Sequence, residues 1–161
     1  MTESDYAVCI HESAHVVLAS KLGLVTRKLE LNWENGWLFG YTSIIEGPRL
    51  SNYLTVLLSG EVAETEIFGK FMLPRHHAGS DREQLFRAVV HAGRAGEQAH
   101  VVAKQTAPRL VRVHKPLIVG LAHDLMAIVA QAQGQDVTVE GDELARLLGD
   151  DVAVLRLAMN G

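Results

Sequence analysis

Apolar side chains recur every three to four residues near the beginning of the chain, at Val8, Ile10, Ala14, Val17 and Leu18. This spacing places them on one face of a helix. Thr2 and Ser4 are suitable N-cap residues, Asp5 suits the positive end of a helix, and Gly23 is a typical stop. We therefore predict a first helix over about residues 5–22, half buried along its apolar face.

After Gly23 the apolar period changes from helical spacing to two. The alternating residues lie on either side of an Asn35-Gly36 pair and are Leu29, Leu31, Trp33, Trp37, Phe39 and Tyr41. Asn-Gly favours a type I′ turn, because both central residues of that turn need a positive φ. The pattern predicts a β-hairpin. It could be a structural lid, or its exposed edge could hold an extended peptide by β-addition.

Helical spacing returns between Gly47-Pro48, which break the chain, and Gly69. The apolar positions run from Leu50 to Phe68 and predict a second helix. Its three glutamates, taken alone, indicate a solvated face: Glu61, Glu64 and Glu66.

The following stretch, residues 70–79, is predicted to be a loop and contains His76 and His77. Ser80-Asp81-Arg82-Glu83 then forms a capping box, which predicts a long helix from residue 80 to about Lys104. An aspartate in a first helical turn, such as Asp81, is favoured by the helix dipole alone.

Two prolines divide the rest of the chain. Pro108 fits the first position of a helix, whereas Pro116 is expected to force a break or a kink. Residues 117–133 predict a further helix, and residues 137–141 a short turn or strand. Two amphipathic helical pieces complete the prediction, at residues 143–148 and 152–159. The elements together predict one mainly α (α+β) domain over residues 1–161.

Composition narrows the classes of function. A net charge of −4 with a pI near 6.0 argues against nucleic acid as a main partner. The single cysteine, Cys9, excludes an intrachain disulfide; we expect it to be a core thiol in a cytoplasmic protein. No apolar run reaches the roughly 18 residues of a membrane span, and the acidic N-terminus lacks the basic start of a signal peptide.

The candidate chemistry lies in residues 11–15, which read His-Glu-Ser-Ala-His and form an H-E-x-x-H motif. Residues four apart share a helix face, so His11 and His15 can reach one Zn²⁺ ion while Glu12 is directed at a zinc-bound water. A catalytic zinc site uses three protein ligands and keeps its fourth position for water. Spacing alone leaves the third ligand open among a second-helix glutamate, Asp81, His76 and His77.

Several segments of the chain resemble, in order and spacing, the peptidase domain of FtsH-type zinc metallopeptidases. They are residues 7–15 with the motif, Gly40-Tyr41-Thr42, residues 57–64 followed by Ile67-Phe68-Gly69, Gly79-Ser80-Asp81 with Glu83-Gln84, and, more weakly, residues 139–144. The resemblance implies a helical, zincin-like metallopeptidase domain with a small sheet beside the zinc helix.

The same resemblance assigns roles to individual residues. It implies that His11, His15 and Asp81 bind zinc and that Glu12 is the general base. It also makes Glu64 a candidate partner that orients one of the ligand histidines.

The chain departs from the family pattern in three places. Ala14 stands where the family commonly has glycine, and Ser80 stands where it has asparagine. The sequence also contains no G-x-x-x-x-G-K-[ST] phosphate loop, so we expect the ATPase module to be absent and the substrate to arrive already unfolded.

We therefore expect a zinc-dependent endopeptidase that hydrolyses unfolded or flexible polypeptides, with its zinc site in residues 1–105 and a C-terminal helical part in 106–161. One alternative is a catalytically weak or inactive zinc-containing domain that binds peptides or regulates a partner. Another is a different H-E-x-x-H peptidase that uses Glu64 or His77 as a ligand. The sequence does not decide whether the protein acts with a separate ATPase partner or forms a homo-oligomer.

Overall fold

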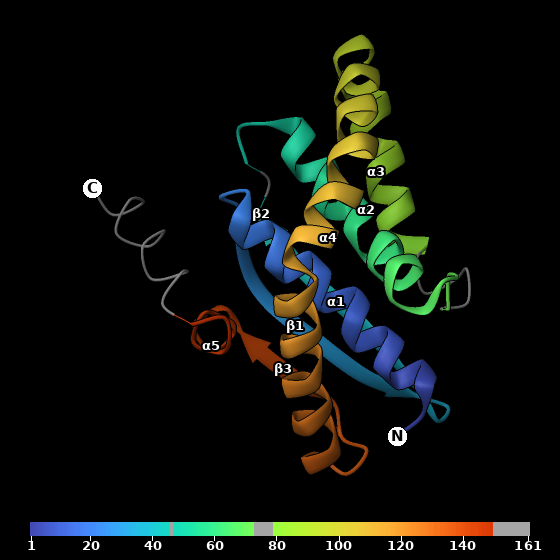
Figure 1. Ribbon diagram of the computed structural model, residues 1–161, viewed down its shortest axis with the longest axis vertical. Coiled ribbons are helices and arrows are strands. Elements are labelled where there is room, and N and C mark those ends of the chain that lie inside the picture. The colour runs from blue at the N-terminus through green and yellow to red at the C-terminus, as the bar shows by residue number, and fades with distance from the viewer. Residues whose placement is uncertain (46, 73–78, 150–161) are drawn as a thin grey trace.

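The computed structural model describes residues 1–45, 47–72 and 79–149. In that part of the chain the structure is mainly helical with a small three-stranded antiparallel sheet, in agreement with the α+β prediction (Figure 1). The elements are α1 (Glu3–Lys21), β1 (Val25–Glu34), β2 (Trp37–Ile45), α2 (Leu50–Phe68), α3 (Gly79–Ala92), α4 (Arg94–Gln131), β3 (Val137–Glu140) and α5 (Gly141–Leu147).

Helix α1 is the central element of the fold. Thr2 is its N-cap and forms a capping box with Asp5: the Thr2 hydroxyl accepts from the Asp5 N–H, and the Asp5 carboxylate accepts from the Thr2 N–H. Every residue from Ala7 to Ala19 is buried. The prediction of a half-buried helix was therefore wrong, because the sheet, α2 and α4 all pack against α1.

Strands β1 and β2 form the predicted hairpin. Asn35 and Gly36 have φ values of 52° and 82°, as a type I′ turn requires. Strand β3 pairs antiparallel with the other side of β1, which gives the order β2-β1-β3. Strand β2 therefore has no strand on its outer side among the described residues.

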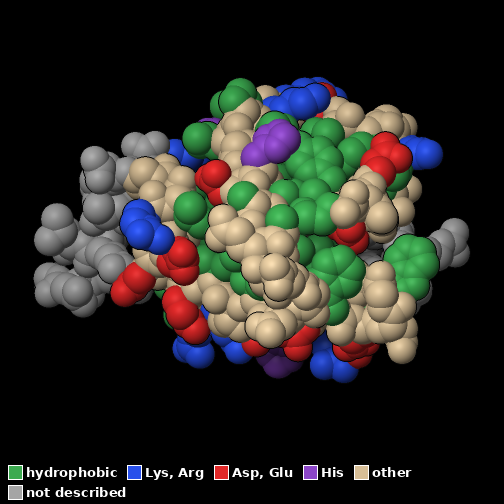
Figure 2. Space-filling view, turned by 90° about the horizontal axis from the view of Figure 1, so that it is seen from below, with side chains coloured by type: hydrophobic (Ala, Val, Ile, Leu, Met, Phe, Trp, Pro, Cys, Tyr) green, Lys and Arg blue, Asp and Glu red, His purple; other side chains and the backbone are tan. Residues whose placement is uncertain are grey.

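Helix α2 has the predicted bounds and ends at Gly69, which adopts the left-handed conformation with φ 72°. It packs against α1 and α4. At the end where α1 begins, the Tyr6 ring lies edge-on against Phe68 of α2, with the ring centroids 5.9 Å apart. A view from this end shows hydrophobic side chains gathered over part of the surface (Figure 2).

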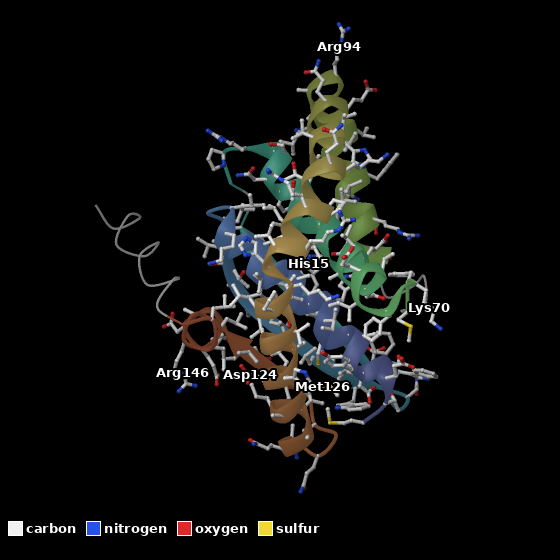
Figure 3. All side chains as sticks on the ribbon, viewed as in Figure 1. His15, Lys70, Arg94, Asp124, Met126 and Arg146 are labelled. Atoms are coloured by element: carbon white, nitrogen blue, oxygen red, sulfur yellow. The ribbon has the colours of Figure 1, made fainter. Side chains whose placement is uncertain are left out.

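The prediction of a single long helix from residue 80 to about Lys104 was wrong, because two helices, α3 and α4, cover this stretch. The chain reverses at Gly93, whose φ of 56° is unfavourable for other residues, and α3 and α4 pack side by side (Figure 1). A Cβ on Gly96 would lie 2.3 Å from the Val89 carbonyl oxygen, so this close pairing requires glycine there. Arg94 marks the tip of the pair, far from His15 in the interior (Figure 3).

Pro108 and Pro116 both lie inside the continuous helix α4. The helix start predicted at Pro108 was therefore wrong, and of the break or kink expected at Pro116 the break does not occur. Each proline removes one backbone hydrogen bond from the helix. Packing of α4 along α1 and α2 supports its helical course on either side of them. The helix also runs across residues 105 and 106, where the sequence analysis divided the chain.

Within the described residues, one helix, α4, is long and apolar enough to cross a membrane by length and composition. Scattered charged residues interrupt the apolar run of α4, so no uninterrupted apolar stretch of about 18 residues is present in it. Of the most apolar 18-residue window of α4, 28% is buried inside the fold. Residues such as Ala103, Val111, Ile118 and Leu125 bury one side of α4 in the core.

The described chain ends with β3 and α5, where the sequence predicted a turn or strand and a helical piece. A Cβ on Gly141 would lie 2.7 Å from the Thr26 carbonyl oxygen, so α5 begins in close contact with β1. The other helical piece predicted near the C-terminus, residues 152–159, lies outside the described residues.

Candidate metal centre

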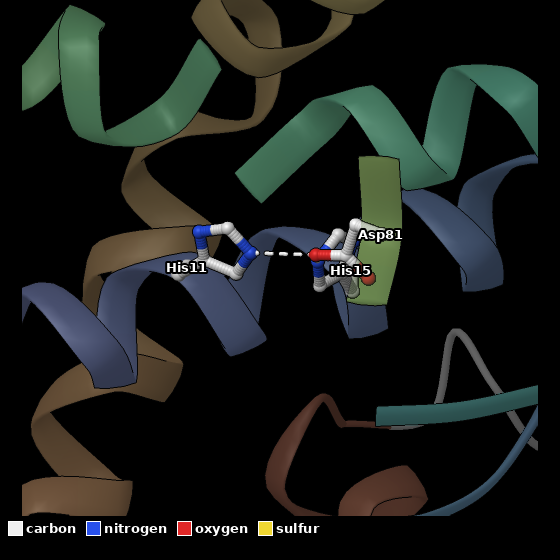
Figure 4. A group of neighbouring side chains, drawn as sticks. All are labelled: His11, His15 and Asp81. Carbon is white, nitrogen blue, oxygen red and sulfur yellow. Dashed lines mark hydrogen bonds and ion pairs between the residues drawn. The ribbon is translucent and has the colours of Figure 1, made fainter. Parts of the chain in front are cut away.

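Two helices that are distant in sequence bring His11, His15 and Asp81 together. The Asp81 Oδ2 atom lies 2.9 Å from His11 Nε2 and 3.1 Å from His15 Nε2. One nitrogen from each histidine and one aspartate oxygen lie within 4.8 Å of one another, close enough to hold a metal ion (Figure 4). The two histidines are buried, and Asp81 is 18% exposed.

Local geometry explains how these side chains converge. His11 and His15 are one helical turn apart on α1, and their ring centroids lie 4.8 Å apart with the planes at 74°. Asp81 lies in the first turn of α3, where the helix dipole favours a carboxylate.

The second ring nitrogen of His11 is held by Glu64. His11 Nδ1 lies 2.6 Å from Glu64 Oε1, and the other Glu64 oxygen accepts the Met72 N–H at 2.9 Å. Because a carboxylate accepts hydrogen bonds, His11 carries a proton on Nδ1, and Nε2 is the ring nitrogen that faces the shared site and is available to a metal ion. Glu64 is fully buried, so the expectation of a solvated face was wrong for this residue.

The remaining two glutamates of α2 are partly exposed, nearer to the predicted solvated face than Glu64 is. Glu61 pairs with Arg82 and Glu66 pairs with Arg112, both through side chains at the surface. Such exposed pairs contribute little to stability.

The second ring nitrogen of His15 is also held by an acceptor. His15 Nδ1 donates to the Val56 carbonyl oxygen at 2.7 Å, and the Ser59 hydroxyl lies 3.3 Å from the same nitrogen. Both histidines therefore have the hydrogen-bonding pattern that is usual for metal-ligating imidazoles.

Glu12 lies beside the triad and is 5% exposed. Burial raises the pKa of its carboxyl, because the charged form is poorly solvated. The hydroxyl of Thr42 donates to Glu12 Oε2 at 2.6 Å and favours the ionised form. A raised pKa makes a glutamate a better proton acceptor than it is in water.

Without a metal, the charges of the two histidines and Asp81 shift one another's pKa values. Burial lowers the pKa of His11, but the hydrogen bonds that the imidazole donates to Asp81 and Glu64 outweigh this effect and raise the pKa to about 10. Burial also opposes charge on His15 and Asp81. The neighbouring opposite charges prevail, so the pKa of His15 is raised and that of Asp81 lies well below its usual range.

Two glycines allow these side chains to pack. A Cβ on Gly60 would lie 2.3 Å from His11 Nε2, and a Cβ on Gly40 would lie 2.4 Å from Glu12 Cγ. Gly40, Thr42 and Gly60 had no predicted role, although all three fall in segments that carry the family resemblance. No residue spacing could reveal their contacts, which join separate elements.

The other sequence-based candidates lie elsewhere. His76 and His77 fall outside the described residues. Cys9 is buried, as expected of a core thiol, and burial raises its pKa to about 12.

A groove of about 670 Å³ between the start of α2 and α3 is lined by Leu50, Tyr53 and Phe86 among others, and no triad residue lines it.

The described residues can therefore hold a metal ion with two imidazole nitrogens and one carboxylate oxygen. Three such ligands fit a catalytic zinc site, which leaves a position for water. The buried acceptors behind both histidines suit the same ligand set. Neither a scan against protein-family models nor a search of curated proteins found a match to this chain.

Proposed function

We propose that this protein is a zinc-dependent endopeptidase that hydrolyses peptide bonds in unfolded or flexible polypeptides. We further propose that it is a zincin-like domain of the FtsH peptidase type. The proposal rests on the convergence of His11, His15 and Asp81 with Glu12 beside them. It is supported by the acceptors that hold the second nitrogen of each histidine.

A bound Zn²⁺ ion would be held by His11, His15 and Asp81, and would supply Lewis acidity toward a water and the scissile carbonyl. In this proposal Glu12 takes a proton from the attacking water and returns it to the leaving amine. Its burial favours this role, because a raised pKa makes the carboxylate a stronger proton acceptor.

One feature of the fold supports this substrate class. Strand β2, which contacts Glu12 through Thr42, has an outer edge that could pair with an extended peptide.

The decisive test compares the wild type with Glu12→Gln, both loaded with one equivalent of zinc, on a fluorescently labelled unfolded polypeptide. We expect the variant to retain zinc and to lose at least about 100-fold in kcat, as removal of a general base should cause. Glu3→Gln, which changes an exposed glutamate of the same helix, is the matched control and should leave cleavage unchanged.

Equal cleavage by the wild type and Glu12→Gln would contradict the proposed mechanism. Zinc and peptide binding without any cleavage by the wild type would instead indicate the alternative function, a zinc-containing peptide-binding or regulatory domain.

A further inference from the structure

Glu12 is fixed by a strand as well as by its own helix. The Thr42 hydroxyl of β2 donates to Glu12 Oε2 at 2.6 Å. Thr42 pairs with Leu29 in the middle of the hairpin, where the strand is held by its ladder with β1. The donor is therefore attached to a rigid part of the sheet, and it joins α1 to β2 directly at the carboxylate.

Gly40 confines the same side chain from a second point on that strand. Residues 40 and 42 lie on one face of β2, because side chains alternate along a strand. A Cβ on Gly40 would lie 2.4 Å from Glu12 Cγ, 2.5 Å from Oε1 and 2.6 Å from Cδ. The Glu12 carboxyl group thus occupies the space that any side chain at position 40 would need.

Together these contacts select one position for a flexible side chain. Glutamate has three rotatable side-chain bonds, and its helix backbone fixes none of them completely. Contact with Gly40 sets where the carboxyl group lies, and the Thr42 hydrogen bond sets how it is turned. With Oε2 anchored to Thr42, we expect Oε1 to be the oxygen that takes the proton of the attacking water.

We propose that Thr42 is a positioning residue, which holds the Glu12 carboxylate in the orientation needed to take a proton. This inference rests on the proposed peptidase function. Thr42 acts through Glu12 and contributes no metal ligand, so its loss should slow the proton transfer while leaving zinc and substrate binding in place. A catalytic group displaced by about 1 Å can lose as much as about 100-fold in rate.

The kinetic test uses Thr42→Val, which keeps the branched shape and removes the hydroxyl, and Thr42→Ser, which keeps the hydroxyl. We expect Thr42→Val to lower kcat by about 10- to 100-fold, with KM within about twofold and one zinc retained, and we expect Thr42→Ser to restore most of kcat. Ser43→Ala is the matched control, since it removes a hydroxyl from the next residue on the opposite face of β2. Wild-type kcat in Thr42→Val, or equal losses in the Val and Ser variants, would overturn the positioning role.

A second readout does not depend on turnover. The side-chain carboxyl carbon of Glu12 can be observed by NMR in protein labelled with ¹³C-glutamate, and Glu12→Gln identifies the signal by its disappearance. We expect this signal to shift in Thr42→Val and to return toward its wild-type position in Thr42→Ser. An unchanged signal in Thr42→Val would overturn the inference. Failure of the wild type to cleave would count against the peptidase function alone.

Discussion

His11 Nδ1 and Glu64 Oε1 lie 2.6 Å apart in the interior, between the central helix α1 and the helix α2. The contact does three things at once. It fixes the proton of His11 on Nδ1, it turns Nε2 toward His15 and Asp81, and it gives the buried Glu64 carboxylate a partner. The ligand atom of His11 is thus oriented by a residue 53 positions away in the chain.

Replacing Glu64 should weaken the metal site without removing a ligand. We expect Glu64→Gln to lower zinc affinity by about 10- to 100-fold, as loss of such an outer partner typically does. The affinity can be measured by competition with a chromogenic chelator. Glu66→Gln is the control, because it removes a charge from the same helix in a pair at the surface. Equal zinc affinities for the wild type and Glu64→Gln would contradict an orienting role for Glu64.

Asp81 should be needed for metal binding. Asp81→Ala removes one of the three ligand atoms, so we expect the purified variant to contain much less than one zinc per chain after dialysis. Elemental analysis by mass spectrometry gives this ratio. Asp124→Ala changes an exposed aspartate on α4 and should bind zinc like the wild type. Full zinc content in Asp81→Ala would point to another third ligand and would reopen the assignment to His77, which lies outside the described residues.

Gly60 and Gly120 offer a matched pair of Gly→Ala changes within helices. At Gly60 the new Cβ would lie 2.3 Å from His11 Nε2, so α1 and α2 would have to separate or the His11 ring would have to move. We expect Gly60→Ala to lower both zinc affinity and the thermal unfolding midpoint. A Cβ on Gly120 would have no neighbour within 4 Å, and Gly120→Ala should stabilise the protein by roughly 0.5–1 kcal/mol.

Thermal unfolding measures the stability of these two variants, and competition with a chelator measures their zinc affinity. Wild-type zinc affinity in Gly60→Ala would show that the His11 ring does not depend on this close approach.

The metal-free protein should lose stability as pH rises above neutrality. The pKa of His11 is raised from 6.5 to about 10 in the folded protein by Asp81 and Glu64, against the effect of burial. A raised folded-state pKa contributes stability that is fully present below about pH 6.5. That contribution is lost as pH rises through about 10. Unfolding temperatures measured in excess chelator should therefore fall over this range.

The matched comparison is His11→Gln, in which that contribution is absent and the decline should be smaller. Zinc should also suppress the decline, because a bound ion requires the neutral imidazole and replaces the proton. Identical pH profiles for the metal-free wild type and His11→Gln would contradict the raised pKa. His91→Gln, at an exposed position, controls for the loss of a histidine and should follow the wild type.

The fold was predictable where local rules decide it. Thr2 as an N-cap, the Asn35-Gly36 turn and Gly69 as a helix end are short-range features, and each appears in the structure where the sequence indicated it. The errors occur where neighbouring elements decide the outcome. The reversal at Gly93 depends on close packing of Gly96 against Val89, and the continuity of α4 past Pro108 depends on the helices packed against it.

The candidate site divides in the same way. The sequence by itself determined that His11 and His15 share one face of a helix with Glu12 beside them, because helical periodicity depends only on spacing. Only the tertiary structure decided that Asp81 meets both histidines and that Glu64 lies behind His11. It also decided that Gly40 and Thr42 enclose Glu12. These contacts join residues 28 to 70 positions apart, and their distances depend on how α1 packs against β2, α2 and α3, which no local pattern encodes.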